Sequence, residues 1–139
     1  MYKDKKITNL SKENLNLWIK ENPDKRFDLS NVTFINKDFT GWRFSKAVLN
    51  NSRFINCNFF EADLSEISAI NVDFTGSKFI KSALYRANLS RSKCINVDFE
   101  NAWMYRCIFS DAVIENCNFH LAKIQKVRWP KDFFNKITI

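Results

Sequence analysis

The sequence has few of the residues that catalytic and metal sites require, and few that break regular structure. There are two Gly, two Pro and one histidine, His120, in 139 residues. No G-x-S-x-G motif and no glycine-rich phosphate-binding loop occurs, so a nucleophilic or metal-dependent active site is not expected. No apolar run is long enough for a signal peptide or a bilayer span. We therefore expect a cytoplasmic protein that is not an enzyme, has no cofactor or metal, and is not inserted in a membrane.

Cysteine is also scarce, and its positions follow neither the spacing of zinc ligands nor that of a small secreted disulfide framework. All four cysteines fall in the two apolar columns that are described next: Cys57, Cys94, Cys107 and Cys117. Free cysteines usually behave as small buried hydrophobic residues. We expect these thiols to be structural rather than metal ligands or redox centres.

Phenylalanine, in contrast, is abundant, with fourteen copies of which most recur at a regular interval. Stepping by five from Leu29 to Trp129 gives twenty-one consecutive apolar residues without an insertion. At the chain's hydrophobic fraction of 45%, chance gives such a run with a probability on the order of 10⁻⁸ before allowance for the search over periods. A second column lies two residues earlier, and from Ala47 to Val127 each of its members is small or β-branched.

A period of five fits neither an α-helix nor a plain strand. Five residues advance an α-helix by about 500°, which spreads the apolar residues around its circumference. In a strand, five is an odd step, so successive central residues fall on opposite faces. Two inward residues per unit require a short extended segment followed by a bend. Four bends of about 90° close a coil of twenty residues, and such coils stack as parallel strands about 4.8 Å apart.

The bends are predicted at the second position after each central residue. This position is Gly or Asn in ten units, and both residues tolerate the left-handed backbone conformation that turns require. The ten residues are Asn31, Asn36, Gly41, Asn51, Asn56, Asn71, Gly76, Asn96, Asn101 and Asn116.

The pattern resembles the pentapeptide-repeat family, whose units read A(D/N)LXX around a central Leu or Phe. The clearest units are 61–65 (EADLS), 86–90 (RANLS), 71–75 (NVDFT) and 96–100 (NVDFE). The resemblance implies an all-β solenoid, a right-handed quadrilateral parallel β-helix, over residues 27–131 with about five coils. It also explains why five aspartates directly precede a central residue (Asp28, Asp38, Asp63, Asp73 and Asp98), so we do not interpret them as catalytic carboxylates. Lys37 and Trp42 stand at small inward positions, which predicts an irregular first coil.

Both ends of the solenoid need protection, because an open coil exposes apolar residues and unpaired strand edges. In the N-terminal segment 1–26, Ser11 is a good N-cap, Leu10 and Leu15 are spaced as a hydrophobic staple, and Pro23 ends the pattern. A capping α-helix is expected at about 11–21. The C-terminal tail 132–139 holds Phe133, Phe134, Ile137 and Ile139. These residues form either a cap or a dimer contact, and the resemblance implies a homodimer joined through the C-terminal ends.

One side of the predicted solenoid differs from the others in charge. The face whose central residues are Phe44, Leu64, Leu84, Met104 and Ile124 carries only two acids, Asp63 and Glu66. Its outward basic and aromatic residues, which we call the basic–aromatic face, are Arg43, Lys46, Tyr85, Arg86, Trp103, Tyr105, Arg106, Lys123 and Lys126. Arg and aromatic residues together are typical of surfaces that contact proteins or single-stranded nucleic acid. The pattern predicts a non-catalytic binding or scaffold protein for an acidic protein or nucleic acid, although a solvated basic surface would give the same pattern.

The family resemblance also implies an alternative function, a DNA mimic that inhibits or protects DNA gyrase. Such a protein occupies the basic DNA-binding saddle of the enzyme and should itself be acidic. Residues 27–131 hold fourteen Lys and Arg against ten Asp and Glu, and the whole chain has a formal net charge of +7. The charge therefore favours the first interpretation.

Overall fold

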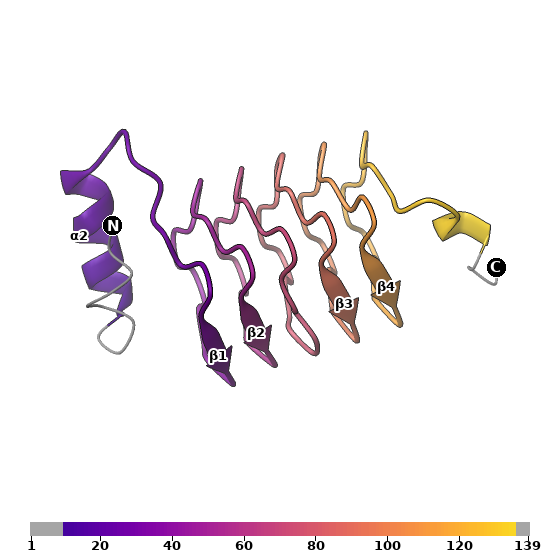
Figure 1. Cartoon of the computed structure of the whole chain (residues 1–139), viewed down its shortest axis with the longest axis horizontal. Coiled ribbons are helices and arrows are strands. Elements are labelled where there is room, and N and C mark those ends of the chain that lie inside the picture. The colour runs from indigo at the N-terminus through magenta and orange to yellow at the C-terminus, as the bar shows by residue number, and fades with distance from the viewer. Residues whose placement is uncertain (1–9, 136–139) are drawn as a thin grey trace.

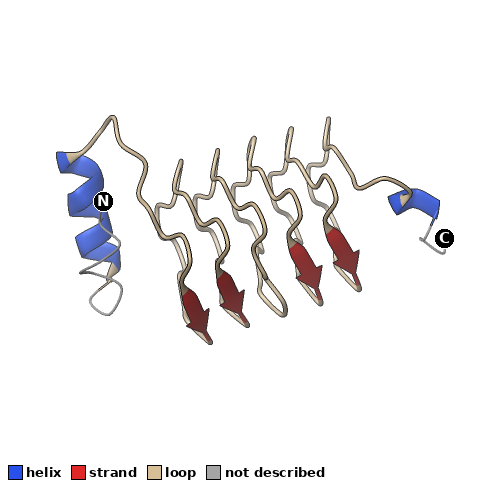
Figure 2. Cartoon of the chain, in the orientation of Figure 1, coloured by secondary structure: helices blue, strands red, loops and turns tan. Residues whose placement is uncertain are grey.

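A computed structural model describes residues 10–135, which form a stack of coils along one axis (Figure 1). Helix α2 lies at one end of the stack and the short 3-10 helix η1 at the other. The strands are short and lie along a single edge of the stack, while bends and extended segments make up the rest of each coil (Figure 2). The elements are α2 (Lys12–Glu21), β1 (Thr33–Ile35), β2 (Arg53–Ile55), β3 (Lys93–Ile95), β4 (Val113–Glu115) and η1 (Phe133–Asn135).

Every coil contains twenty residues, as the sequence predicts. Strand β1 pairs with β2 in parallel, with Phe34 opposite Phe54, and β3 pairs with β4, with Cys94 opposite Ile114. Isolated parallel bridges repeat the same interval on the other walls, from Asp28–Val48 to Ile108–Arg128. Residues twenty apart in the sequence therefore lie one above another, and we call each such column a file.

The bends occur where the Asn and Gly pattern places them. All ten predicted corner residues have a positive φ, including Gly41 at 71° and Gly76 at 73°. Residues of other types occupy the remaining corners in the same conformation, for example Arg86 at 55° and Arg106 at 59°. The period of five, and not the residue type alone, therefore decides where the chain turns.

The core is a set of stacked side-chain files. The longest consists of phenylalanines whose successive ring centroids are 5.2, 4.8, 5.3 and 5.1 Å apart: Phe39, Phe59, Phe79, Phe99 and Phe119. In a second file Phe54 stacks on Phe34 at 5.6 Å and on Phe74 at 5.9 Å. The small inward column is also ordered, since the buried Ser52 hydroxyl donates to the Leu29 carbonyl in the coil below at 2.8 Å.

The aspartates before the central residues have a structural role. The Asp28 carboxylate accepts from the Ser30 amide at 2.9 Å, and the Asp38 and Asp73 carboxylates accept from the amides of Thr40 and Thr75 at 3.0 and 2.9 Å. Asn88 accepts from Ser90 in the same way at 3.0 Å. These local bonds stabilise the bend that follows, which explains why Asp and Asn interchange at this position.

The first coil departs from the pattern as expected. Lys37 is exposed although it stands at a small inward position. Trp42 is half-buried and packs against Phe39 and Phe44, with ring centroids 4.9 and 5.6 Å apart. The regular small column thus begins at Ala47, which is fully buried.

The N-terminal end of the stack carries helix α2. The Ser11 side chain accepts from the Asn14 amide at 3.0 Å, so it is the N-cap of a helix that begins one residue later. Leu10 and Leu15 are buried with the core residues, and the Trp18 ring meets Phe27 edge-on at 5.1 Å. The helix therefore lies within two residues of the predicted bounds.

The C-terminal end is covered only in part. Trp129 stacks between Phe109 at 5.6 Å and Phe133 at 4.7 Å, so the tail folds against one wall of the last coil. Ile124, the inward central residue of another wall, remains 42% exposed, and Phe134 is 65% exposed. The other two tail residues, Ile137 and Ile139, lie outside the described residues.

We predict that the core files carry the stability. Phe59→Ala removes a fully buried ring that stacks on Phe39 and Phe79, and it should lower the free energy of unfolding by about 3–5 kcal/mol. The neighbouring Phe60 points outward and is half-buried, so Phe60→Ala should cost about 1 kcal/mol or less. Urea unfolding of both variants tests this, and equal losses would contradict the assignment of inward and outward positions.

Candidate functional site

The basic–aromatic face contains an exposed tryptophan, Trp103. Parallel bridges place Arg43, Asp63, Ala83, Trp103 and Lys123 in one file, in that order. The Lys123 ammonium lies 5.4 Å from the centroid of the Trp103 ring, and Trp103 is 58% exposed. On the other side of Trp103 the neighbour is Ala83, whose methyl group is too small to cover an indole. In the same file Arg43 lies two coils further from Trp103 than Ala83 does, with Asp63 between Arg43 and Ala83.

A neighbouring file holds two stacked tyrosines, Tyr85 and Tyr105, whose rings lie close to cations. The rings of Tyr85 and Tyr105 stack with their centroids 5.4 Å apart and an interplanar angle of 11°. The guanidinium groups of Arg86 and Arg106 each lie 5.4 Å from the centroid of the tyrosine before them, and the Lys126 ammonium lies 6.0 Å from Tyr105. A hydrogen bond with Arg106 lowers the pKa of the Tyr105 phenol and raises that of Arg106. Cation–π contacts thus favour positions of these cations beside the tyrosine rings.

These cations occupy an unusual corner file. Its members all have a positive φ: Lys46 at 64°, Glu66 at 58°, Arg86 at 55°, Arg106 at 59° and Lys126 at 59°. Each of the other three corner files contains at least one Asn, whereas this one contains neither Asn nor Gly. A residue with a Cβ in the left-handed conformation costs about 1 kcal/mol or more. The left-handed backbone conformation at these corners therefore disfavours the long charged side chains that occupy them.

The predicted residues fall into two groups along this surface. Seven lie together on the C-terminal coils: Tyr85, Arg86, Trp103, Tyr105, Arg106, Lys123 and Lys126. Arg43 and Lys46 lie on an earlier coil, and Asp63 and Glu66 stand between them and the larger group. None of Arg86, Arg106 and Lys126 has a carboxylate partner within residues 10–135.

A groove runs beside the corner file, and the sequence pattern alone does not reveal it. Its C-terminal part, which we call the cationic groove, is a hollow of about 350 Å³ lined by Arg86, Arg106, Ile108, Lys126 and Arg128. Arg128 belongs to the next five-residue unit, and its bridge to Ile108 places it one coil beyond Ile108 on the adjoining wall. The only signal for it in the sequence is a basic residue two positions after Lys126.

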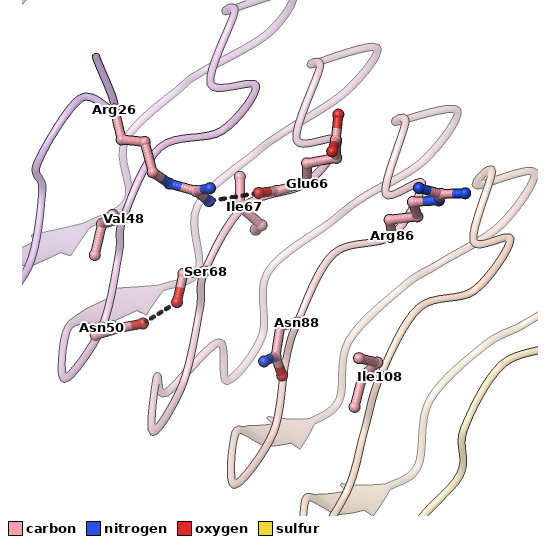
Figure 3. A pocket seen from close by; sticks show the side chains of 9 residues that line it. All are labelled: Arg26, Val48, Asn50, Glu66, Ile67, Ser68, Arg86, Asn88 and Ile108. Carbon is pink, nitrogen blue, oxygen red and sulfur yellow. Dashed lines mark hydrogen bonds between the residues drawn. The ribbon is translucent and has the colours of Figure 1, made fainter. Parts of the chain in front are cut away.

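The N-terminal part of the groove is a hollow of about 590 Å³ in which some of the polar groups bond to one another (Figure 3). There the Arg26 guanidinium donates to the Glu66 carbonyl at 2.7 Å, and the Ser68 hydroxyl donates to Asn50 at 2.9 Å. The side chain of Arg86 borders both hollows but joins neither bond. The groove therefore changes along its length from internally bonded to uniformly cationic.

The remaining candidate chemical groups are placed as structural residues or stand alone. Burial raises the pKa of Cys94 to about 12 and also raises that of Cys107, which keeps both thiols protonated. His120 is exposed. Among the described residues no group of three or more His, Cys, Asp or Glu is arranged to hold a metal ion. No helix within 10–135 is long and apolar enough to cross a membrane.

Solved structures with the same architecture are pentapeptide repeat proteins. A protein from the Arabidopsis thaliana thylakoid lumen matches at a TM-score of 0.53 with 23% identity, over 71% of this chain and 66% of that one. HetL, a protein of Nostoc sp. strain PCC 7120 involved in heterocyst differentiation regulation, matches at 0.49 with 15% identity, over 75% and 60%. QnrB1, a plasmid-mediated fluoroquinolone resistance protein, matches at 0.40 with 14% identity, over 76% and 72%. This chain thus spans just under two thirds of the first two relatives.

These likenesses concern the fold, which in pentapeptide repeat proteins is a right-handed β-helix. No curated protein matches the sequence. The model of the Pentapeptide repeats family, however, matches residues 28–65, 57–93 and 92–128, with eight copies. Together these segments span most of the coils, and the chain therefore belongs to the pentapeptide repeat family.

Proposed function

We propose that this protein is a non-catalytic binding protein of the cytoplasm whose basic–aromatic face contacts an acidic macromolecule, either an acidic protein or a nucleic acid. The observation that supports it is the corner file, where Arg86, Arg106 and Lys126 stand on successive coils without a carboxylate partner in the described chain. An acidic partner would supply the missing counter-charge.

The energetics of this file support a binding role. Cations on adjacent coils are about 4.8 Å apart at the backbone, so their like charges repel one another. The left-handed backbone adds a further cost at each corner. Asn would avoid both costs and occurs at least once in each of the other three corner files. Residues that lower the stability of a fold without a structural gain are commonly retained for function.

We predict that the variant Arg86→Asn/Arg106→Asn separates stability from binding. Asn suits a positive φ, so the free energy of unfolding should stay constant or rise by about 1 kcal/mol per site. Binding to an acidic probe should weaken at least tenfold, because the loss of two charge-assisted contacts removes more than about 1.4 kcal/mol. Fluorescence anisotropy with a labelled polyglutamate peptide, a single-stranded oligonucleotide and a duplex measures binding, and thermal unfolding measures stability.

A matched control is available on the same coils. Lys81→Asn/Arg91→Asn also removes two corner cations, at φ values of 58° and 56°, from two other files. This variant should bind like the unmodified protein. If both double variants lose the same affinity, only net charge matters, and if no probe binds the unmodified protein, the proposal fails.

The alternative, a gyrase inhibitor that mimics DNA, is tested separately. Its surface should be acidic to fit a basic saddle, whereas residues 27–131 have an excess of Lys and Arg. We therefore expect no inhibition of gyrase supercoiling at concentrations that saturate the acidic probe. Inhibition that survives the Arg86→Asn/Arg106→Asn change would favour the alternative over the binding function proposed above.

We further propose how the chain is divided and assembled. Residues 1–26 would form a segment whose helix protects the first coil, 27–131 the solenoid, and 132–139 a tail that joins two copies through their C-terminal ends. The exposure of Ile124 and Phe134 supports the dimer, because both are large apolar residues at the open end of the stack. A second copy placed end to end would cover them.

This arrangement predicts an effect of one substitution on the oligomeric state. Ile124→Lys places a charge in the end-to-end contact and should convert a dimer to a monomer in sedimentation experiments. Ile35→Lys is the control, since Ile35 is 56% exposed but lies in β1 near the other end. A chain that sediments as a monomer without any substitution would contradict the dimer.

A further inference from the structure

The cationic groove and Trp103 together favour one class of acidic partner. Four cations surround the exposed part of Ile108, and the lining contains no acidic residue. Three of them lie on successive coils, about 4.8 Å apart at the backbone, and Arg128 lines the same groove from the adjoining wall. Each cation at this spacing can bind the oxygens of one phosphate through charge-assisted hydrogen bonds. The groove therefore has the form of a track for successive phosphate groups.

Phosphates alone do not account for the aromatic residues beside the track. One side of the Trp103 ring faces Lys123, and the residue at the same position of the coil on its other side is Ala83. In the adjacent file two aromatic rings stack on neighbouring coils, namely Tyr85 and Tyr105. The position of Ala83 thus corresponds to a missing ring in a stack. A flat group of the ligand can occupy this place and stack on the indole, as bases do on aromatic residues of single-strand binding proteins.

We infer that the cationic groove binds the backbone of a single-stranded nucleic acid while one of its bases stacks on Trp103 above Ala83. This inference rests on the proposed function and selects one partner class within it. An acidic peptide supplies negative charge but no flat group next to each charge. A duplex supplies phosphates, but its bases are paired and stacked internally and cannot reach the indole. The unpaired strand alone satisfies both the groove and the tryptophan.

The salt dependence of binding provides a test on the unmodified protein. Four phosphate contacts in single-stranded nucleic acid predict a slope of about −3 for the logarithm of affinity against the logarithm of salt concentration. The measurement is fluorescence anisotropy of a labelled twelve-residue oligothymidylate, titrated with the full chain at several salt concentrations. A slope shallower than about −1 would overturn the inference without any variant.

Two substitutions should act differently on this slope. Arg106→Asn removes one phosphate contact, so it should weaken binding and reduce the steepness of the slope by about 0.7. Trp103→Ala should weaken binding roughly five- to hundredfold through lost stacking, with the slope unchanged. Trp103→Phe keeps an aromatic ring and should recover most of the affinity. If Trp103→Ala leaves the affinity for the oligonucleotide unchanged, the stacking position is wrong and the inference fails.

The partner classes are separated by the choice of probe. The oligothymidylate should bind more tightly than a duplex of equal length or a polyglutamate peptide of equal charge. If the peptide binds through Arg86 and Arg106 and the oligonucleotide does not, the single-strand inference is wrong while the proposed binding face stands. If none of the three binds, both proposals fail.

Discussion

The hydrogen-bonded interval between neighbouring coils is the constraint on which the rest of the molecule depends. The Phe39 amide donates to the Asn58 carbonyl at 2.7 Å, and the Asn58 amide donates to the Lys37 carbonyl at 2.9 Å. Because this register recurs on every wall, side chains twenty residues apart in the sequence must stack. The phenylalanine file and the cation file are consequences of the same register, one inside the solenoid and the other outside it.

Much of this arrangement follows from the sequence because the repeat has no insertion. The period of five predicts the files, and Asn and Gly predict the corners, so that Tyr85 lies over Tyr105 and Trp103 beside Lys123 as their spacing implies. The hand of the solenoid does not follow from a period, since a mirror-image coil has the same one. The groove was also not predictable, because its walls come from two adjacent faces and its shape depends on the direction in which Arg128 leaves the backbone.

The corner files show how a repeat can vary its surface without losing its fold. Ladder hydrogen bonds and inward residues determine the coil, which leaves the corner side chain free to vary at a backbone cost of about 1 kcal/mol. Asn71 and Asn116 use their corners for structure, as each donates to the asparagine one coil below, at 2.8 and 2.6 Å. Arg86 and Arg106 use theirs to hold charge above a tyrosine ring. The same backbone position thus links neighbouring coils in one file and, in the binding role proposed above, contacts the partner in another.

The location of the cations near the open end would link the proposed binding to the stability of the solenoid. Each coil contacts only its neighbours, so the last coil has one partner instead of two and opens most easily. Lys126 and Arg128 lie on this last coil, whereas Arg86 and Arg106 lie on the coils before it. A ligand that bridges all four would hold three successive coils together. Its binding free energy would then add to the cohesion of the end of the stack, where Ile124 is incompletely covered.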